Sequence, residues 1–133
     1  MAFAFSAAWA PQLRSILRIV AGLMFMLHGT QKLLAFPDPS QNMSGAPAIV
    51  KVAGVIELFC GALIAAGLLT AIAAFIASGE MAVAYFTAHA SKGGFWPTMN
   101  QGELAALYCF VFLYLAFAGP GPWSLDAKFR RRA

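Results

Sequence analysis

Long apolar segments dominate the chain, and short stretches rich in Pro, Gly, Ser and Asn interrupt them. The apolar segments run over residues 15–36, 49–69, 71–90 and 102–118. Each of them approaches the length of about 20 residues that an α-helix needs to cross a bilayer. The pattern therefore predicts an all-α fold, an integral membrane four-helix bundle that forms a single domain over residues 1–133.

The boundary between the second and third segments depends on a length argument. Residues 52–90 are almost continuously apolar, which is roughly twice the length of one span. A break at residues 78–80 would leave the following piece too short to cross the membrane. A break near Thr70 gives two pieces of the right length, and Thr can cap the third helix. We therefore expect the turn at residues 69–71.

Other helix ends carry capping signals. Pro11 is typical of the first turn of a helix, so the first helix is expected to begin before its membrane span. Asn100 and Glu103 form the N-x-x-E pattern of a capping box, which predicts the start of the fourth helix. After this helix, Ser124 and Asp126 are spaced as the cap and first turn of a short interfacial helix.

Composition supports the membrane assignment. Hydrophobic residues make up 61% of the 133 residues and charged residues only 11%. Soluble domains are about 45–50% apolar and about 25% charged, and a globule of this size leaves much of its surface in water. A monomeric soluble domain, a disordered chain and a disulfide scaffold are therefore excluded, and the lipid bilayer is the expected partner.

Charge predicts the orientation of the bundle. The chain carries a formal net charge of +4, and basic residues gather at Arg14, at Arg18 and in the last residues, 128–132. Because cytoplasmic segments carry an excess of Lys and Arg, both termini are expected in the cytoplasm, with residues 119–133 as a basic cytoplasmic tail. Basic residues do not alternate with stacking aromatics, so no nucleic acid partner is expected. The first residues lack the basic and apolar regions of a signal peptide, so the first segment is expected to remain as an uncleaved span.

The sequence contains no motif for a metal or a covalent cofactor. Cys60 and Cys109 lie in apolar segments and do not form a C-x-x-C motif, which indicates two buried apolar side chains. His and Cys are not spaced as metal ligands. His28 and His89 have different predicted depths, which argues against a haem held by two histidines. His89 is expected at the interface, about 180° from Glu80 around the third helix.

Ionisable residues inside the spans are costly and are candidates for function. Four of them are His28, Lys32, Glu57 and Glu80, with Glu80 close to the middle of the third segment and Lys32 one turn nearer the outside than His28. His28 and Glu57 both lie eight residues from the outer end of their segments, roughly 12 Å deep at the helical rise. We therefore predict one interior polar pocket around these four side chains. Arg18, near the cytoplasmic end, is expected to extend to the headgroups.

Small residues accompany these charges on two helix faces. Steps of three and four residues place one set on a single face of the first helix: Arg18, Gly22, Phe25, Gly29 and Lys32. The second helix carries a similar face: Gly54, Glu57, Gly61 and Ile64. Because glycines allow close approach of helices in membranes, the two faces are expected to pack together, with Glu57 as partner of Lys32 or His28.

The polar residues have two alternative interpretations. Glu57 either forms a structural ion pair that fixes helix register, or it binds a ligand headgroup or relays protons. In the second case Phe25, Phe59 and Tyr85 are candidate wall residues of the pocket, and the catalytic residues remain unknown.

Several segments in order resemble the DoxX family of small bacterial membrane proteins. They read LRIVAGLMFMLHGTQKLL, VAGVIELFCGALIAAGLLT, GEMAVAYF, NQGELAALY and GPGPWSLD, and together they extend from Leu13 to Asp126. The resemblance implies a four-helix protein of the bacterial cytoplasmic (inner) membrane. The family takes its name from a subunit of a thiosulfate:quinone oxidoreductase, and some members are linked to oxidative-stress complexes. This chain has neither a thiosulfate motif nor a dithiol, so the thiosulfate activity is not carried over.

Three functions are compatible with these observations. The first is a redox-linked subunit that binds a quinone or similar lipid-soluble ligand and receives electrons from a redox partner protein. The second is a non-enzymatic membrane scaffold that recruits partners. The third, a small proton-coupled transporter, is favoured least because the first span lacks an acidic residue. The sequence leaves open the ligand, any enzymatic activity and the oligomeric state, a homo-oligomer included.

Overall fold

The computed structural model describes residues 7–132, so expectations for the first six residues and for Ala133 lie outside the described part of the chain. The described residues form helices and loops without a strand. The four long helices are α1 (Ala10–Leu34), α2 (Ala48–Ala66), α3 (Thr70–Ala84) and α6 (Glu103–Ala118). Shorter helices complete the chain: the 3-10 helices η1 (Ala7–Trp9) and η2 (Pro39–Gln41), the π-helix η3 (Tyr85–Ala90), α4 (Ser91–Gly93), α5 (Pro97–Asn100) and α7 (Leu125–Arg130).

Within residues 7–132, three helical segments are long and apolar enough to cross a membrane. They are residues 7–34, 48–66 and 70–93, the last of which continues from α3 through η3 and α4. The fourth apolar helix, α6, has 16 residues and is shorter than a usual span. Together with the apolar composition, this arrangement confirms the prediction of an all-α integral membrane bundle.

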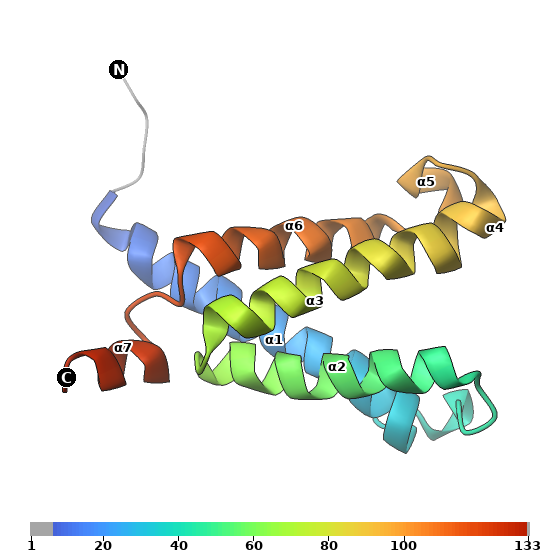
Figure 1. The fold of residues 1–133 in the computed structure, drawn as a ribbon, viewed down its shortest axis with the longest axis horizontal. Coiled ribbons are helices and arrows are strands. Elements are labelled where there is room, and N and C mark those ends of the chain that lie inside the picture. Colours follow the sequence, from blue (N-terminus) through green and yellow to red (C-terminus); the bar gives the residue numbers. More distant parts are fainter. Residues whose placement is uncertain (1–6, 133) are drawn as a thin grey trace.

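The bundle consists of two helix pairs. The closest packing joins α1 to α2 and α3 to α6 (Figure 1). The pairs meet where α2 packs against α3. They also meet through Phe25 of α1, whose ring lies 5.5 Å from Tyr108 and 4.8 Å from Phe112 of α6 between centroids. Helices α2 and α3 are joined by a tight turn and diverge away from it (Figure 1). We call the end with this turn, the start of α1 and α7 the terminal end, and the end with loops 35–47 and 94–102 the loop end.

Glycines set the close packing of α1 against α2. A Cβ atom at Gly29 would lie 2.6 Å from the carbonyl oxygen of Gly54, and one at Gly61 would lie 2.5 Å from the backbone nitrogen of Met26. Backbone cannot move aside as a flexible side chain can. The predicted contact between the two glycine faces is therefore confirmed.

Replacing Gly29 by Ala should destabilise the protein by about 1–3 kcal/mol, because the added methyl group overpacks the interface. Gly79 of α3 is the matched control, since a Cβ there would meet nothing within 4 Å. Gly79→Ala should leave stability unchanged or raise it by up to about 1 kcal/mol through helix propensity. Unfolding in mixed micelles measures both changes, and equal effects would contradict the close α1–α2 contact.

The turn between α2 and α3 lies at Gly67–Leu69, next to the predicted site. Gly67 ends α2 with a φ of 70°, a conformation that favours glycine. Leu69 also has a positive φ and precedes α3. The expected capping by the Thr70 side chain is wrong, because the Asp126 carboxylate of α7 accepts hydrogen bonds from the backbone nitrogens of Leu69 and Thr70, each at 2.9 Å. Burial raises the pKa of Asp126, but these hydrogen bonds outweigh it and hold the pKa below its usual value.

Arg18 lies inside the terminal end of the bundle. Its side chain is fully buried, and Nη1 donates to the carbonyl oxygens of Ile64 and Ala65, both at 2.6 Å. Nε donates to Pro120 at 2.8 Å, and Nη2 donates to the carbonyl of Trp123. The expectation that Arg18 extends to the headgroups is therefore wrong. Carbonyl groups at the C-terminal end of a helix lack helical partners. The guanidinium satisfies that of Ala65 and adds a second donor to that of Ile64, which also accepts from Gly67 N.

Two other capping predictions have different outcomes. Ser124 caps α7 as expected, because its Oγ accepts from the backbone nitrogen of Ala127 at 3.1 Å. The capping box at Asn100 and Glu103 is wrong. Helix α6 starts after Gly102, and the Asn100 side chain instead ties the loop together by accepting from Gly102 N and donating to Gly94 O.

Candidate functional site

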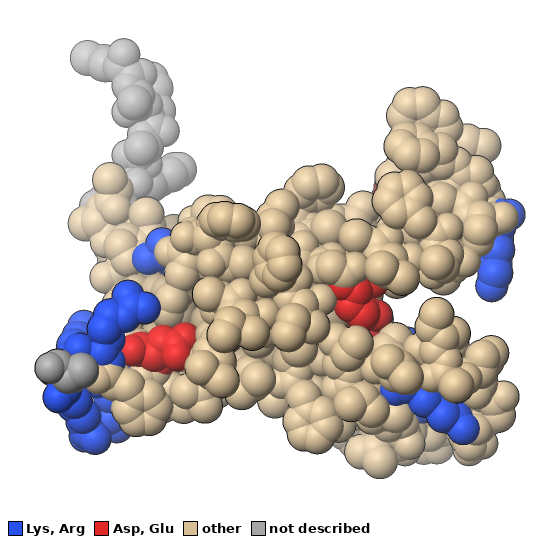
Figure 2. All heavy atoms as spheres, in the orientation of Figure 1, with Lys and Arg blue, Asp and Glu red and all other residues tan. Residues whose placement is uncertain are grey.

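A pocket of about 740 Å³ lies between α2 and α3, where the two helices diverge toward the loop end. Residues of α1, α2, α3, η3 and α6 line it. The space-filling view shows the hollow on this side of the molecule, with acidic atoms at its inner end (Figure 2). All four predicted residues line the pocket: His28, Lys32, Glu57 and Glu80.

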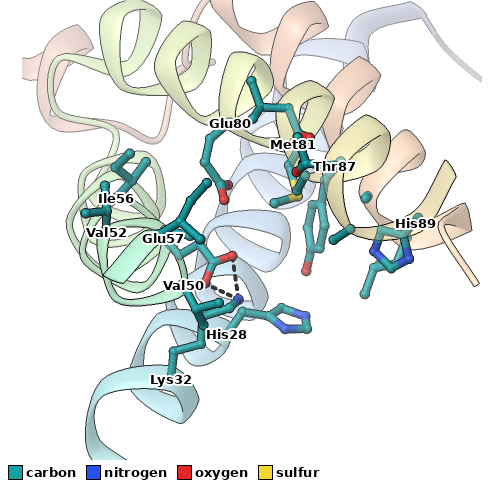
Figure 3. Close-up of a pocket in the computed structure, with 18 of the residues that line it drawn as sticks. His28, Lys32, Val50, Val52, Ile56, Glu57, Glu80, Met81, Thr87 and His89 are labelled. Carbon is teal, nitrogen blue, oxygen red and sulfur yellow. Dashed lines mark hydrogen bonds and ion pairs between the residues drawn. The ribbon is translucent and has the colours of Figure 1, made fainter. Parts of the chain in front are cut away.

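An ion pair forms one wall of the pocket. Lys32 Nζ of α1 donates to both carboxylate oxygens of Glu57 on α2, at 2.7 Å and 2.6 Å (Figure 3). The Glu57 side chain is only 2% exposed, whereas that of Lys32 is 22% exposed. Glycines next to both residues bring α1 and α2 close enough for this short contact. Glu57 therefore pairs with Lys32, one of the two partners expected from the sequence.

Two buried polar atoms of the pocket lack hydrogen-bond partners in the part of the chain that the structure describes. Glu80 extends from α3 toward the ion pair (Figure 3), and its Oε2 atom is buried without a hydrogen bond to any described residue. The Tyr108 hydroxyl of α6 is in the same situation. Such groups are rare in proteins, because each costs about 1–3 kcal/mol when it is unsatisfied. A ligand or water in the pocket would supply the missing partners.

His28 stands beside the ion pair (Figure 3). Its ring contacts Tyr108 edge to face, with 6.0 Å between centroids. In the described part of the chain, no hydrogen bond fixes either ring nitrogen, so both are available to a molecule in the pocket. Around the pocket, α1 thus contributes a cation and an imidazole, α2 and α3 contribute carboxyl groups, and α6 contributes a hydroxyl group.

The aromatic wall differs from the prediction. Phe25 lines the pocket, but Phe59 and Tyr85 do not. Phe59 is 63% exposed on the outer face of α2, because two residues beyond Glu57 correspond to about 200° of helix rotation. The Tyr85 hydroxyl is turned toward the loop and donates to the carbonyl oxygen of Phe95. Tyr108, which the sequence reasoning missed, takes the place of the second aromatic residue.

His89 also lines the pocket, although the sequence placed it on the opposite side of the helix. The estimate of 180° from Glu80 assumed an uninterrupted α-helix. Residues 85–90 instead form a π-helix, which takes more residues per turn and changes the direction of every later side chain. Sequence alone carries no clear signal for this insertion.

The chain matches a family model over more than half of its length. The model is that of DoxX, and it covers residues 13–90. The chain belongs to the DoxX family. The matched region contains the pocket residues of α1, α2, α3 and η3, whereas Tyr108 lies beyond it.

Two other proteins are similar to this DoxX chain over nearly its full length. An uncharacterized protein of Haemophilus influenzae is 48% identical over 128 residues, which cover 93% of this chain and 96% of the relative. An uncharacterized membrane protein of Mycobacterium tuberculosis is 32% identical over 133 residues, with 88% and 81% coverage. No solved structure matches the chain. These similarities support a membrane location for the DoxX protein and do not assign it a reaction.

The described residues of the DoxX chain do not contain a cluster of three or more His, Cys, Asp or Glu that could hold a metal ion. Both cysteines are free, and Cys60 is buried in the bundle. The pocket lining itself offers carboxyl, imidazole, ammonium and phenol groups, which can form hydrogen bonds and transfer protons. These groups can bind and orient a polar headgroup inside the membrane.

Proposed function

We propose that this protein binds a lipid-soluble ligand of the quinone class in the pocket between α2 and α3. The observation that carries the proposal is a pair of buried atoms, Glu80 Oε2 and the Tyr108 hydroxyl, that have no partner within residues 7–132 and lie in a largely apolar cavity. A quinone ring fits this environment because it is flat and apolar but carries oxygens that accept or donate hydrogen bonds.

The apolar side of the pocket, between α2 and α3, supports entry of a ligand from the bilayer. Ile49 and Val52 of α2 and Ile76 and Val83 of α3 line the pocket and are also 46–63% exposed. In a membrane protein, exposed apolar side chains on spanning helices face lipid. The gap between these helices is therefore an apolar side opening, through which an isoprenoid or alkyl tail can extend into the lipid.

The proposed role is redox-linked and depends on a partner. Reduction of a quinone to a quinol takes two electrons and two protons. Groups such as Glu80, His28 and Tyr108 can supply hydrogen bonds and protons, while the electrons come from a redox partner protein. In this role the chain is the quinone-binding subunit of an oxidoreductase, and the chemistry of the electron donor resides in the partner.

The proposed location is the bacterial cytoplasmic membrane, with the terminal end in the cytoplasm. Six of the nine basic residues lie at that end: Arg14, Arg18, Lys128, Arg130, Arg131 and Arg132. Figure 2 shows basic atoms gathered there. The excess of Lys and Arg on cytoplasmic segments supports this orientation. The loop end, toward which α2 and α3 diverge, then faces the outside.

One observation favours a second candidate, a membrane scaffold without a ligand. The Lys32–Glu57 pair satisfies both carboxylate oxygens of Glu57 within the protein, as expected of a pair that only fixes the register of α1 and α2. In that case the pocket would be filled by lipid, and the protein would act through the partners that it recruits.

Ligand binding can be measured with the protein in nanodiscs, using decylubiquinone and a short-chain menaquinone as probes. Tyr108→Phe removes one hydroxyl and should weaken binding by roughly fivefold, and Glu80→Leu should weaken it by roughly tenfold or more. Phe59→Leu on the lipid-facing side of α2 is the control and should leave the affinity unchanged. Absence of saturable binding of both probes to the unmodified protein would reject the quinone proposal and favour the scaffold.

A further inference from the structure

The pocket has a second, polar end. Beyond Glu80 toward the loop end, its lining includes Thr87, His89, Lys92 and Gln101. Lys92 has neither an ion pair nor a hydrogen bond with any described residue, and it is exposed. A compact ammonium group without a partner is strongly hydrated. This end of the pocket is therefore in contact with water, in contrast to the apolar opening between α2 and α3.

His89 is held in one tautomer at this polar end. Its Nδ1 lies 3.1 Å from the carbonyl oxygen of Asn100. A carbonyl oxygen can only accept, so Nδ1 carries the proton and donates it, and Nε2 of the neutral ring is an acceptor. The Asn100 side chain in turn bonds Tyr85 and Gly94, so the loop holds the imidazole in place.

The interior of the pocket can hold water. Each water needs about 30 Å³ in the liquid and two to four polar partners. The cavity of about 740 Å³ is much larger than this, and its buried lining offers the unpartnered Glu80 and Tyr108 atoms. Water entering from the polar end would satisfy both atoms.

We propose that Thr87, Ala88, His89, Lys92 and Gln101 form a hydrated mouth through which Glu80 exchanges protons with the aqueous phase at the loop end. The mouth is separate from the apolar side opening. The inference rests on the proposed pocket and is independent of which ligand enters it. The titratable groups around Glu80 that share this water come from every neighbouring helix: His28 and Lys32 of α1, Glu57 of α2, His89 of η3, Lys92 of α4 and Tyr108 of α6.

A hydrated mouth at the loop end would let the pocket exchange protons with one side of the membrane only. Protons that a bound quinone takes up would come from the loop end, and protons that a quinol releases would pass to it, while the terminal end is closed by Arg18 and its carbonyl partners. A ligand would thus enter from the lipid and exchange protons with water at one surface only.

Cysteine labelling with a charged, membrane-impermeant thiosulfonate tests the hydrated mouth. In a background with Cys60 and Cys109 replaced by Ala, Ala84→Cys places a thiol on the pocket wall, one turn after Glu80. Ala82→Cys is the matched control, because Ala82 lies two residues away on α3 and does not line the pocket. Reagent added at the loop end should modify Cys at position 84 roughly tenfold faster or more, since only a thiol in contact with water ionises readily.

Three further variants separate the possible causes of the result. Ser40→Cys, in the loop before α2, should react with reagent from the same side, and Arg132→Cys should not. Adding Ala88→Trp at the mouth should slow the reaction of Cys at position 84 severalfold without changing that of Cys at position 40. Equal, slow labelling at positions 82 and 84 with fast labelling at position 40 would overturn the hydrated mouth. Because no ligand is present, this outcome is distinguishable from a failure of quinone binding.

Discussion

Replacing Arg18 by Met should cause one of the largest losses of stability of any single substitution in this protein, at least about 3 kcal/mol. The guanidinium is fully buried and donates to four carbonyl oxygens from two parts of the chain. Met retains the apolar stem but removes the side-chain donor from the carbonyls of Ala65, Pro120 and Trp123, whereas that of Ile64 keeps its bond from Gly67 N. Each buried acceptor left unsatisfied costs about 1–3 kcal/mol. The loss should also loosen the segment that carries Asp126, which caps α3.

The free energy of unfolding in mixed micelles measures this effect. Arg14→Met is the matched control, because Arg14 lies one turn earlier on α1 and, among the described residues, makes a single hydrogen bond, from Nη1 to the carbonyl of Ala118. Its replacement should cost roughly 1 kcal/mol. Arg18→Lys keeps the charge but not the planar fork, so an intermediate loss is expected. Similar small losses for Arg18→Met and Arg14→Met would mean that Arg18 does not join these segments.

The helices and the α1–α2 interface could be predicted from the sequence because their signals are local. Apolar length predicts a span, and steps of three and four residues place Gly22 and Gly29 on one face of α1. Equal depth then placed Glu57 opposite the polar residues of α1. The structure brings these residues together, and Lys32 forms the ion pair with Glu57.

The features that the sequence reasoning missed depend on contacts between distant segments. Arg18 could be buried only because α2 ends beside it and the chain after α6 folds back over it. Asp126 replaced Thr70 as the cap of α3 from 56 residues away. No local sequence pattern predicts either contact, since both form only in the packed bundle.

The sequence predicts the polar residues of the pocket but not the space between the helices. Titratable residues in apolar segments identified its polar wall, but the divergence of α2 and α3 that makes room for a ligand is a property of packing. The π-helix at residues 85–90 turns His89 to the mouth of the pocket, although an uninterrupted α-helix would place it about 180° from Glu80. Phe59, a candidate wall residue, follows Glu57 by two residues, and this helix rotation turns it to the outer face of α2, away from the pocket.

Replacing Glu57 by Gln should destabilise the protein by about 3–5 kcal/mol, the usual cost of removing one partner of a buried ion pair. The amide cannot neutralise the Lys32 ammonium, which is held at 2.6–2.7 Å from both carboxylate oxygens. Lys32→Met should cause a similar loss, because it leaves the nearly buried Glu57 carboxylate without its cation. A much smaller loss for Lys32→Met would show that Lys32 contributes little beyond reaching toward the headgroups.

The double variant Lys32→Met with Glu57→Leu separates a structural pair from a functional one. Apolar residues of similar volume often replace a buried ion pair without loss of stability, so unfolding should return close to that of the unmodified protein. Decylubiquinone binding is then the deciding measurement. If the pair belongs to the ligand site, the stable double variant should bind at least about tenfold more weakly, a change of about 1.4 kcal/mol. Unchanged affinity would limit the pair to fixing the register of α1 and α2, and would leave ligand recognition to Glu80 and Tyr108 alone.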